Sequence, residues 1–212
     1  MIAFMLATAA GPSPVPANPC NPAAACRYIE AISVRDPDGG DPLQRKVGRW
    51  LQFVRDGKLV LTPGEVVTVQ LSDGGPVVTA SAKLAPDDHA HAGEEHASRQ
   101  QDYSDITGDR TVGLIRKLEQ NPLYAAEPNR LRIAFMQAED GSDDMVLRIS
   151  SGYRSPVTYK ASITVSGFKP QATTVCPVLA AKTAFETWPN AILQIELSDF
   201  ALRESGAAEA CR

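Results

Sequence analysis

Residues 157–166 read VTYKASITVS and alternate strictly between apolar and polar side chains. The side chains that fall on one face of an extended chain here are Val157, Tyr159, Ala161, Ile163 and Val165. A period of two is typical of a β-strand that buries one face. We therefore expect a strand in this segment, in a sheet whose apolar side covers a hydrophobic core.

The same alternation recurs along the chain in segments 67–71, 78–84, 131–135 and 145–150, with further candidates at 28–34, 47–54 and 192–202. The pairs and triplets that favour turns between them are Asp56-Gly57, Pro63-Gly64, Asp73-Gly74-Gly75, Asp140-Gly141 and Ser151-Gly152. Roughly eight or nine short strands with such turns predict an all-β, mainly antiparallel fold, an immunoglobulin-like β-sandwich. Within 192–202 the alternation changes phase between Leu197 and Phe200, which predicts a bulge.

One segment has helical spacing instead. Val112, Ile115 and Leu118 lie three residues apart within 110–120, and Asn121-Pro122 follow. This pattern predicts one short helix, capped by Asp109.

The polar stretch 85–109 divides the strands into an earlier and a later set. It is long for a passive connector. It is either a loop of one sandwich or a link between two small β domains. We expect one β-sandwich domain over residues 27–212, with 85–109 as a long acidic loop that contains the histidines.

The N-terminal region has two parts with different compositions. Residues 1–10 combine an apolar run with small residues, which predicts the remnant of a secretory signal peptide. Residues 11–26 are rich in proline and predict an extended spacer. We therefore expect an exported protein, periplasmic or secreted.

The four cysteines are Cys20, Cys26, Cys176 and Cys211. An even number of cysteines in an exported chain predicts disulfides. We expect the pairs Cys20–Cys26 and Cys176–Cys211, while a crossed arrangement that joins the first segment to the last stays open. No Cys-x-x-Cys spacing is present, so we interpret the cysteines as structural rather than as a redox or zinc-thiolate site.

The composition is that of an ordinary globular protein. Hydrophobic residues make up 43% of the 212 residues, charged residues 22%, and the net charge is −4. The acidic balance argues against a nucleic-acid partner. No apolar run reaches the length needed to cross a bilayer, so we expect no membrane span.

Residues 87–96, DDHAHAGEEH, contain all three histidines of the chain. They also contain four carboxylates and no Lys or Arg, so their charge of −4 equals that of the whole chain. In an extended chain His89 and His91 point to the same side, and Gly93 allows the backbone to fold back. The candidate metal ligands are His89, His91, His96, Asp88 and Glu94.

Imidazole and carboxylate ligands suit zinc, copper or nickel. The competing interpretation of this stretch is a solvated acidic loop whose histidines bind nothing.

The motifs of catalysis are missing or misplaced. Ser166-Gly167-Phe168-Lys169 matches Ser-x-x-Lys, but it follows a strand and meets Pro170, where the chemistry would need a helix. There is no Gly-x-Ser-x-Gly elbow and no phosphate-binding Gly-rich loop. The three carboxylates of 36–41 are typical of a turn more than of a calcium site. We assign no catalytic and no cofactor-binding residues.

The two tryptophans, Trp50 and Trp188, are expected to pack in the core. For Trp188 the alternative is an exposed contact patch with Pro189.

Val175-Cys176-Pro177-Val178, followed by Phe185–Pro189 and an alternating strand to Leu202, resembles uncharacterised exported proteins of proteobacteria. The alternation at 145–165 adds to this resemblance, which covers about the last 70 residues, the C-terminal third. It implies export and gives no activity and no catalytic residues.

Three functions therefore compete. The first is a non-catalytic binding or assembly module of the cell envelope or exterior, with an unknown envelope protein or ligand as partner, contacted through exposed edge strands. The second is a divalent-metal-binding protein that uses loop 87–96. The third is a hydrolase, which would need a concave pocket with two or more convergent titratable groups.

Overall fold

The computed structural model describes residues 15–35, 40–83, 125–138 and 144–204. Among these residues there are twelve strands and one short 3-10 helix, η1 (Ala23–Ala25). Every strand pairing is antiparallel, so the expected all-β antiparallel fold is confirmed. The helix expected at 110–120 and its cap Asp109 lie outside the described residues.

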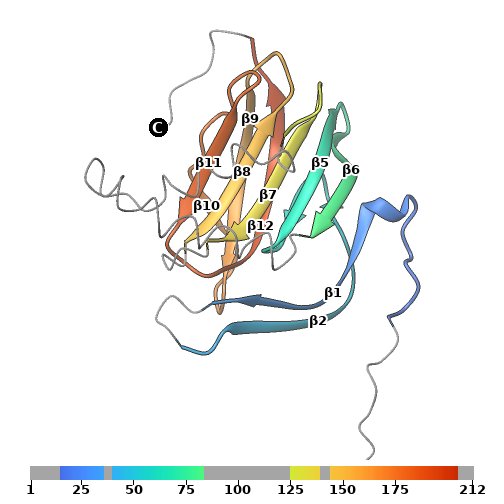
Figure 1. Ribbon diagram of the computed structural model, residues 1–212, viewed down its shortest axis with the longest axis vertical. Helices are drawn as coiled ribbons and strands as arrows, with labels where there is room; N and C mark the ends of the chain where they lie inside the picture. The colour runs from blue at the N-terminus through green and yellow to red at the C-terminus, as the bar shows by residue number, and fades with distance from the viewer. Residues whose placement is uncertain (1–14, 36–39, 84–124, 139–143, 205–212) are drawn as a thin grey trace, which may run out of the picture.

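Ten strands form two five-stranded sheets that pack face to face (Figure 1). The β9 sheet has, in order, β10 (Gln171–Thr173), β9 (Val157–Val165), β12 (Ile192–Leu202), β4 (Lys58–Leu61) and β3 (Val54–Arg55). The β8 sheet has, in order, β11 (Thr183–Trp188), β8 (Met145–Ser151), β7 (Leu131–Gln137), β5 (Glu65–Ser72) and β6 (Gly75–Lys83). Both sheets mix early and late strands, because β4 pairs with β12 and β5 pairs with β7.

Strand β9 has the predicted alternation. Val157, Tyr159 and Ala161 are buried in the core, and Lys160 is exposed between them. The bulge predicted in the last strand is confirmed, because the register of β12 against β9 shifts between Ser198 and Ala201. A bulge inserts an extra residue into one strand and so reverses the faces that follow.

The central strands β8 and β7 of the β8 sheet are buried on both faces. The inner face of this sheet supplies large buried side chains of the main core, including Leu147, Ile149 and Phe135. Its outer face carries a second buried cluster: Val66, Ala134, Met136, Ala138 and Val146. Strand β8 itself is buried at all seven positions. Any polar side chain on the outer side of β8 therefore lies in an environment of low polarity.

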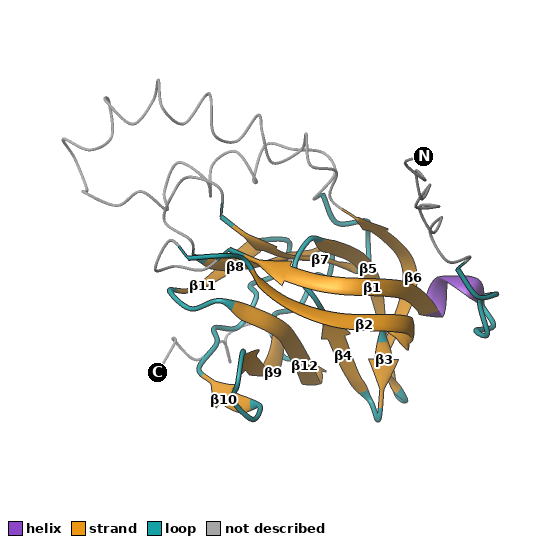
Figure 2. Cartoon of the chain, turned by 90° about the horizontal axis from the view of Figure 1, so that it is seen from below, coloured by secondary structure: helices purple, strands orange, loops and turns teal. Residues whose placement is uncertain are grey.

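The remaining two strands, β1 (Cys26–Val34) and β2 (Leu43–Gln52), pair only with each other. They form a hairpin that lies across one end of the two sheets (Figure 2). Ile29, Ile32 and Val34 point into the main core, so the hairpin closes the end of the sandwich and buries apolar area there. A bulge interrupts the pairing where Gly48 has a φ of 62°.

Arg27, the second residue of β1, connects the hairpin to both sheets. It is 7% exposed, and its Nε and Nη2 atoms lie 2.7 and 3.1 Å from the two carboxylate oxygens of Glu65 in β5. Nη2 also donates to the carbonyl of Val60 in β4 at 2.9 Å, and Nη1 donates to the carbonyl of Gln52 at 2.7 Å. The guanidinium carbon lies 4.2 Å from the ring centroid of Phe53. A buried arginine is thus paired, hydrogen-bonded and stacked at once.

The far end of β1 is fastened to β7 by a second set of polar contacts. The backbone N–H of Arg35 donates to Oε1 of Gln137 at 2.7 Å, and Nε2 of Gln137 donates back to the Arg35 carbonyl at 3.1 Å. The Arg35 guanidinium also donates to the carbonyl of Ala138. The amide side chain therefore satisfies backbone groups at the end of β1.

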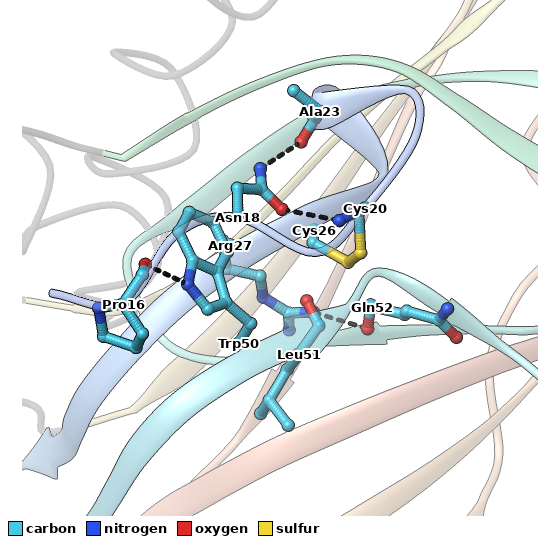
Figure 3. The surroundings of a disulfide bond; sticks show 9 residues. All are labelled: Pro16, Asn18, Cys20, Ala23, Cys26, Arg27, Trp50, Leu51 and Gln52. Atoms are coloured by element: carbon cyan, nitrogen blue, oxygen red, sulfur yellow. Dashed lines mark hydrogen bonds between the residues drawn. A yellow bond between two sulfur atoms is a disulfide. The ribbon is translucent and has the colours of Figure 1, made fainter.

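The segment before β1 lies against the hairpin (Figure 3). Cys20 and Cys26 form a disulfide, as predicted, and the N–H of Cys20 donates to Oδ1 of Asn18 at 2.9 Å. Trp50 lies beside Tyr28 and donates from Nε1 to the carbonyl of Pro16 at 2.8 Å.

The two tryptophans therefore differ in environment. Trp50 is only half-buried and is not part of the main core cluster, against expectation, because it holds the N-terminal segment. Trp188 is in the core, and its Nε1 donates to Oγ1 of Thr173 at 2.9 Å.

We predict that Arg27→Met lowers the free energy of unfolding by about 3–5 kcal/mol, because it leaves the Glu65 carboxylate buried without its cation. The double variant Arg27→Met/Glu65→Leu should be more stable than this single variant, since no buried charge then remains. Urea denaturation followed by circular dichroism measures both.

The matched control is the exposed ion pair between Lys160 and Asp199, whose nitrogen and oxygen lie 2.8 Å apart. Lys160→Ala should leave the denaturation midpoint essentially unchanged, because water already solvates both charges. A midpoint for Arg27→Met as high as that of Lys160→Ala would contradict the role assigned to Arg27.

Candidate cationic cavity

Three segments meet at one end of the β8 sheet and line an open cavity of about 520 Å³, named here the β8–β11 cavity. The turn into β11 supplies Ala181, Lys182 and Thr183. The end of β8 and the loop after it supply Arg148, Ser150, Ser151, Gly152 and Arg154. The segment that leads into β7 supplies Ala125, Ala126 and Pro128. Loops at the end of a rigid sheet are common positions for binding sites.

The charged side chains that line the cavity are all cationic: Arg148, Arg154 and Lys182. Arg148 is 2% exposed and lies on the outer face of β8, where its guanidinium carbon is 5.9 Å from the ring centroid of Phe185. Arg154 and Lys182 are exposed. None of the described residues that line the cavity is a carboxylate.

Hydroxyl groups lie beside these cations. The Oγ of Ser150 and the Oγ1 of Thr183 are 2.9 Å apart on adjacent strands and form a hydrogen bond. Only one of the two hydrogens can lie between the oxygens, so the other hydroxyl can donate elsewhere. Ser151 uses its Oγ to accept the backbone N–H of Tyr153 at 3.2 Å.

Backbone hydrogen bonds hold the three segments in place. The N–H of Ser151 donates to the carbonyl of Lys182 at 2.9 Å, and the N–H of Gly152 donates to the carbonyl of Arg130 at 2.8 Å. The carbonyl of Gly152 accepts the N–H of Asn129 at 3.0 Å. Backbone hydrogen bonds therefore join residues 151–152 to the segment before β7 and to the turn before β11, as expected for a preformed binding site.

Two backbone positions around the cavity are sterically demanding. A Cβ at Gly152 would lie 1.9 Å from the carbonyl oxygen of Glu127, so only glycine fits against that turn. Ala181 has a φ of 51°, a left-handed conformation that costs an alanine about 1–2 kcal/mol. Strain of this kind persists only where surrounding contacts impose it, and it is frequent at functional sites.

Tyr153 positions the loop between β8 and β9. Its carbonyl accepts the N–H of Ala181 at 2.9 Å, and its hydroxyl oxygen accepts the N–H of Leu71 at 2.9 Å. The pairing of β5 with β7 ends at Val69, so Leu71 has no partner in β7. The Tyr153 hydroxyl thus satisfies a backbone donor at the end of the sheet.

Tyr159 is a contrasting buried tyrosine in the core. Its hydroxyl has no hydrogen-bond partner among the described residues. Burial raises the pKa of this phenol far above its usual value, and the nearby Glu186 carboxylate adds to that rise.

Glu186 is itself partly buried, and burial raises the pKa of its carboxyl group. The backbone N–H of Cys176 donates to Oε1 of Glu186 at 2.5 Å and opposes that rise. Neither Tyr159 nor Glu186 lines the cavity.

A second hollow of about 250 Å³ lies between the N-terminal segment, residues 52–54 and the start of β6. Its lining is apolar apart from Gln52 and includes Pro22, Phe53 and Val78. It lacks the several convergent polar groups that orient a ligand, so the β8–β11 cavity is the stronger candidate.

The candidate metal ligands named from the sequence are not among the residues that the structure describes. His89, His91, His96, Asp88 and Glu94 all lie outside the described residues. Among the described residues, no group of three or more His, Cys, Asp and Glu side chains could hold a metal ion.

The remaining residues singled out from the sequence have simpler outcomes. Cys176 is disulfide-bonded, and its expected partner Cys211 lies outside the described residues. Ser166 and Lys169 lie at the turn between β9 and β10, where no helix brings them together.

In the part of the chain that the structure covers, no helix is long and apolar enough to cross a membrane.

Sequence reasoning missed the residues of the β8–β11 cavity. The alternation at 145–150 placed Arg148 and Ser150 opposite the apolar face of a strand, which ordinarily means solvent. Among the sequence features that we singled out, the one that falls in the cavity is the Ser151-Gly152 pair, which we interpreted only as a turn. Its additional role, a close approach of two backbones, is visible only in three dimensions.

Comparison with known proteins identifies no relative of this chain. No protein-family model, no curated protein and no solved structure matches it.

We predict that Tyr153→Phe lowers the free energy of unfolding by about 1 kcal/mol, since it removes the acceptor of the part-buried N–H of Leu71. Tyr159→Phe should maintain or raise stability, because it removes a hydroxyl that has no partner among the described residues. Equal losses in urea denaturation for the two variants would contradict this assignment.

Gly152→Ala should shift the 127–130 turn away from β8 or destabilise the fold by about 1–3 kcal/mol, because the added carbon overlaps the Glu127 carbonyl. Gly74→Ala is the matched control, since its nearest contact would be Ser72 Oγ at 3.8 Å. Amide hydrogen exchange at Asn129 and Gly152 should accelerate only in the first variant. Unchanged exchange there would refute the steric argument.

Proposed function

We propose that this protein is a non-catalytic, exported binding module with an immunoglobulin-like β-sandwich fold, and that it binds a small ligand in the β8–β11 cavity. The observation that carries the proposal is the convergence of three segments on one open cavity, whose polar groups are held by hydrogen bonds. Binding functions on β-sandwiches typically reside in the loops at the ends of the sheets.

The chemistry of the lining favours binding over catalysis. The described lining residues include cations and hydroxyls but no carboxylate, histidine or cysteine. A serine or threonine nucleophile needs a base that takes its proton, whereas Ser150 Oγ is bonded to Thr183 Oγ1 and Ser151 Oγ accepts the N–H of Tyr153. The described contacts join none of these hydroxyls to the Lys182 amine, so they do not support the hydrolase hypothesis.

Export is supported by the oxidised cysteines. The Cys20–Cys26 disulfide and the disulfide-bonded Cys176 are typical of proteins in an oxidising compartment, such as the periplasm or the exterior of the cell. The prolines before β1 agree with a spacer that precedes a folded domain.

Strand addition at a sheet edge is a less favoured mode of binding. The β9 sheet ends in the very short strands β3 and β10, and β6 begins with Gly75-Pro76 and ends at Lys83. Strand β2 has the exposed cations Arg45, Lys46 and Arg49 and the bulge at Gly48. Short length, proline, charge and bulges are the features by which natural sheets prevent edge-to-edge pairing.

The proposal is tested by two-dimensional NMR of the full chain with a mixture of small aromatic alcohols, amines, carboxylates and phosphates. We expect the amide signals of Ser151, Gly152 and Thr183 to shift, because these residues line the cavity. Shifts confined to β2 or β6, or no shifts at all, would contradict a ligand site in the cavity.

A plugged cavity provides the control. Ala125 is exposed and lines the cavity, so Ala125→Trp should fill the volume without entering the core and should abolish the shifts. Ala172→Trp places the same side chain on exposed β10 in the other sheet and should preserve them.

A further inference from the structure

We propose that the outer face of the β8 sheet is a docking surface for residues 84–124 of this chain, which pack on it as a third layer. The contact is made by the helix that the sequence predicts over 110–120. This docking is independent of the proposed function, because it occupies a face of the sheet and not the ligand cavity.

The outer face of the β8 sheet carries an apolar cluster that is shielded from solvent. Its members, named here the outer cluster, are 0–3% exposed: Val66, Ala134, Met136, Ala138 and Val146. The partly buried apolar side chain packed against them is Phe185 of β11, a strand of the same sheet. Side chains on one face of a sheet stand side by side and cannot bury one another completely, so this face requires a further layer.

The described neighbours of the β8 sheet cover other parts of it. The β1–β2 hairpin contributes Ile29, Ile32 and Val34 to the main core, which lies on the inner face. The end of β1 reaches the outer cluster at its margin, where Arg35 donates to the carbonyl of Ala138. The layer over the rest of the outer cluster must therefore come from residues outside the described ranges.

Length and position single out residues 84–124. The segment leaves β6 at Lys83, which pairs with Glu65 at the hairpin end of the sheet, and the described chain resumes at Ala125. Ala125 lines the β8–β11 cavity together with Arg148 and Ser150, which alternate with the core side chains of β8 and so lie on its outer side. The connection thus runs from β6 past β5 and β7 to β8. The short route is over the outer face, because the core fills the inner one.

The dimensions permit this route with a helix included. Three strand spacings amount to about 14 Å. A helix over 110–120 is about 16 Å long. The other stretches outside the described ranges suit the outer cluster less well: 36–39 and 139–143 connect neighbouring strands, and 205–212 follows β12 of the β9 sheet.

The apolar residues of 84–124 match the outer cluster. Val112, Ile115 and Leu118 recur every three residues within the predicted helix, so they share one side of it. Packing that side on the outer cluster would remove both apolar surfaces from water, which is the main driving force for joining two layers.

The charge of 84–124 matches the polar part of the same face. Arg132 and Arg148 lie beside the outer cluster on β7 and β8, and Arg148 is 2% exposed. Residues 84–124 contain eight Asp and Glu against four Lys and Arg. Buried arginines are stable where carboxylates or other acceptors lie in the layer that covers them. A segment of opposite charge therefore fits this part of the face.

Methyl NMR of the full chain, with isoleucine, leucine, valine and methionine labelled, tests the docking directly. We expect nuclear Overhauser contacts from the Met136 methyl group to the methyl groups of Ile115 or Leu118. Met145 is the internal control, because it is 0% exposed and belongs to the main core on the inner face. Its contacts should remain within that core.

Two variants locate the contact on the predicted helix. Ile115→Asp and Leu118→Asp should each accelerate oxidation of Met136 by hydrogen peroxide at least about tenfold, since a buried carboxylate favours the undocked state. Oxidation of Met145 should not change. Lys117→Asp is the matched control, because it places an aspartate on the opposite side of the same helix and should leave Met136 protected. Fragmentation mass spectrometry assigns oxidation to each methionine.

Several outcomes would overturn the docking of 84–124. Methyl contacts from Met136 to residues 1–14 would assign the outer face to the N-terminal segment. Protection of Met136 that disappears on dilution would assign it to a second copy of the chain. Equal Met136 oxidation in all three variants would exclude the predicted helix as the contact. If a variant exposes Met136 and Met145 alike, it has unfolded, and the methyl contacts of the parent protein decide.

Discussion

The buried pair of Arg27 and Glu65 is the contact on which the architecture depends. One guanidinium joins the β1–β2 hairpin to β5 through the carboxylate and to β4 through the Val60 carbonyl, and so reaches both sheets. The second carboxylate oxygen also accepts the N–H of Thr62 at 2.7 Å. Burying two charges costs several kcal/mol each, and these bonds offset that cost only with all partners in place. The pair therefore specifies one position of the hairpin.

The position of the hairpin determines how the core is closed at one end of the two packed sheets. With the hairpin across one end, Ile29, Ile32 and Val34 complete the main core, and the disulfide and Trp50 hold the preceding segment beside it. The cavity lies where the connections after β8 and before β7 and β11 meet. The central strands of this sheet are buried on both faces, so they cannot shift without disturbing two hydrophobic clusters, and this restrains the connections at their ends.

The two buried tyrosines show how polar groups are distributed in such a fold. The Tyr153 hydroxyl satisfies a backbone donor where a strand pairing ends and so supports the cavity loop. The Tyr159 hydroxyl lies in the core without a partner among the described residues, stacked through its ring on Phe200. The same side chain thus contributes a hydrogen bond in one place and only ring packing in the other.

The sequence by itself determined the local features of this protein. Alternation in 145–150 and 157–166 predicted strands, and the phase change after Leu197 predicted the bulge. The even number of cysteines in a chain expected to be exported predicted disulfides, with Cys20–Cys26 as one of the favoured pairs. These features depend on neighbours within a few residues, so a period or a spacing reveals them. The tertiary structure alone decided that Arg27 is buried, because Glu65 lies 38 residues away. It also decided that Arg148, Arg154 and Lys182 share a cavity, because three separate connections must first converge on one end of a sheet.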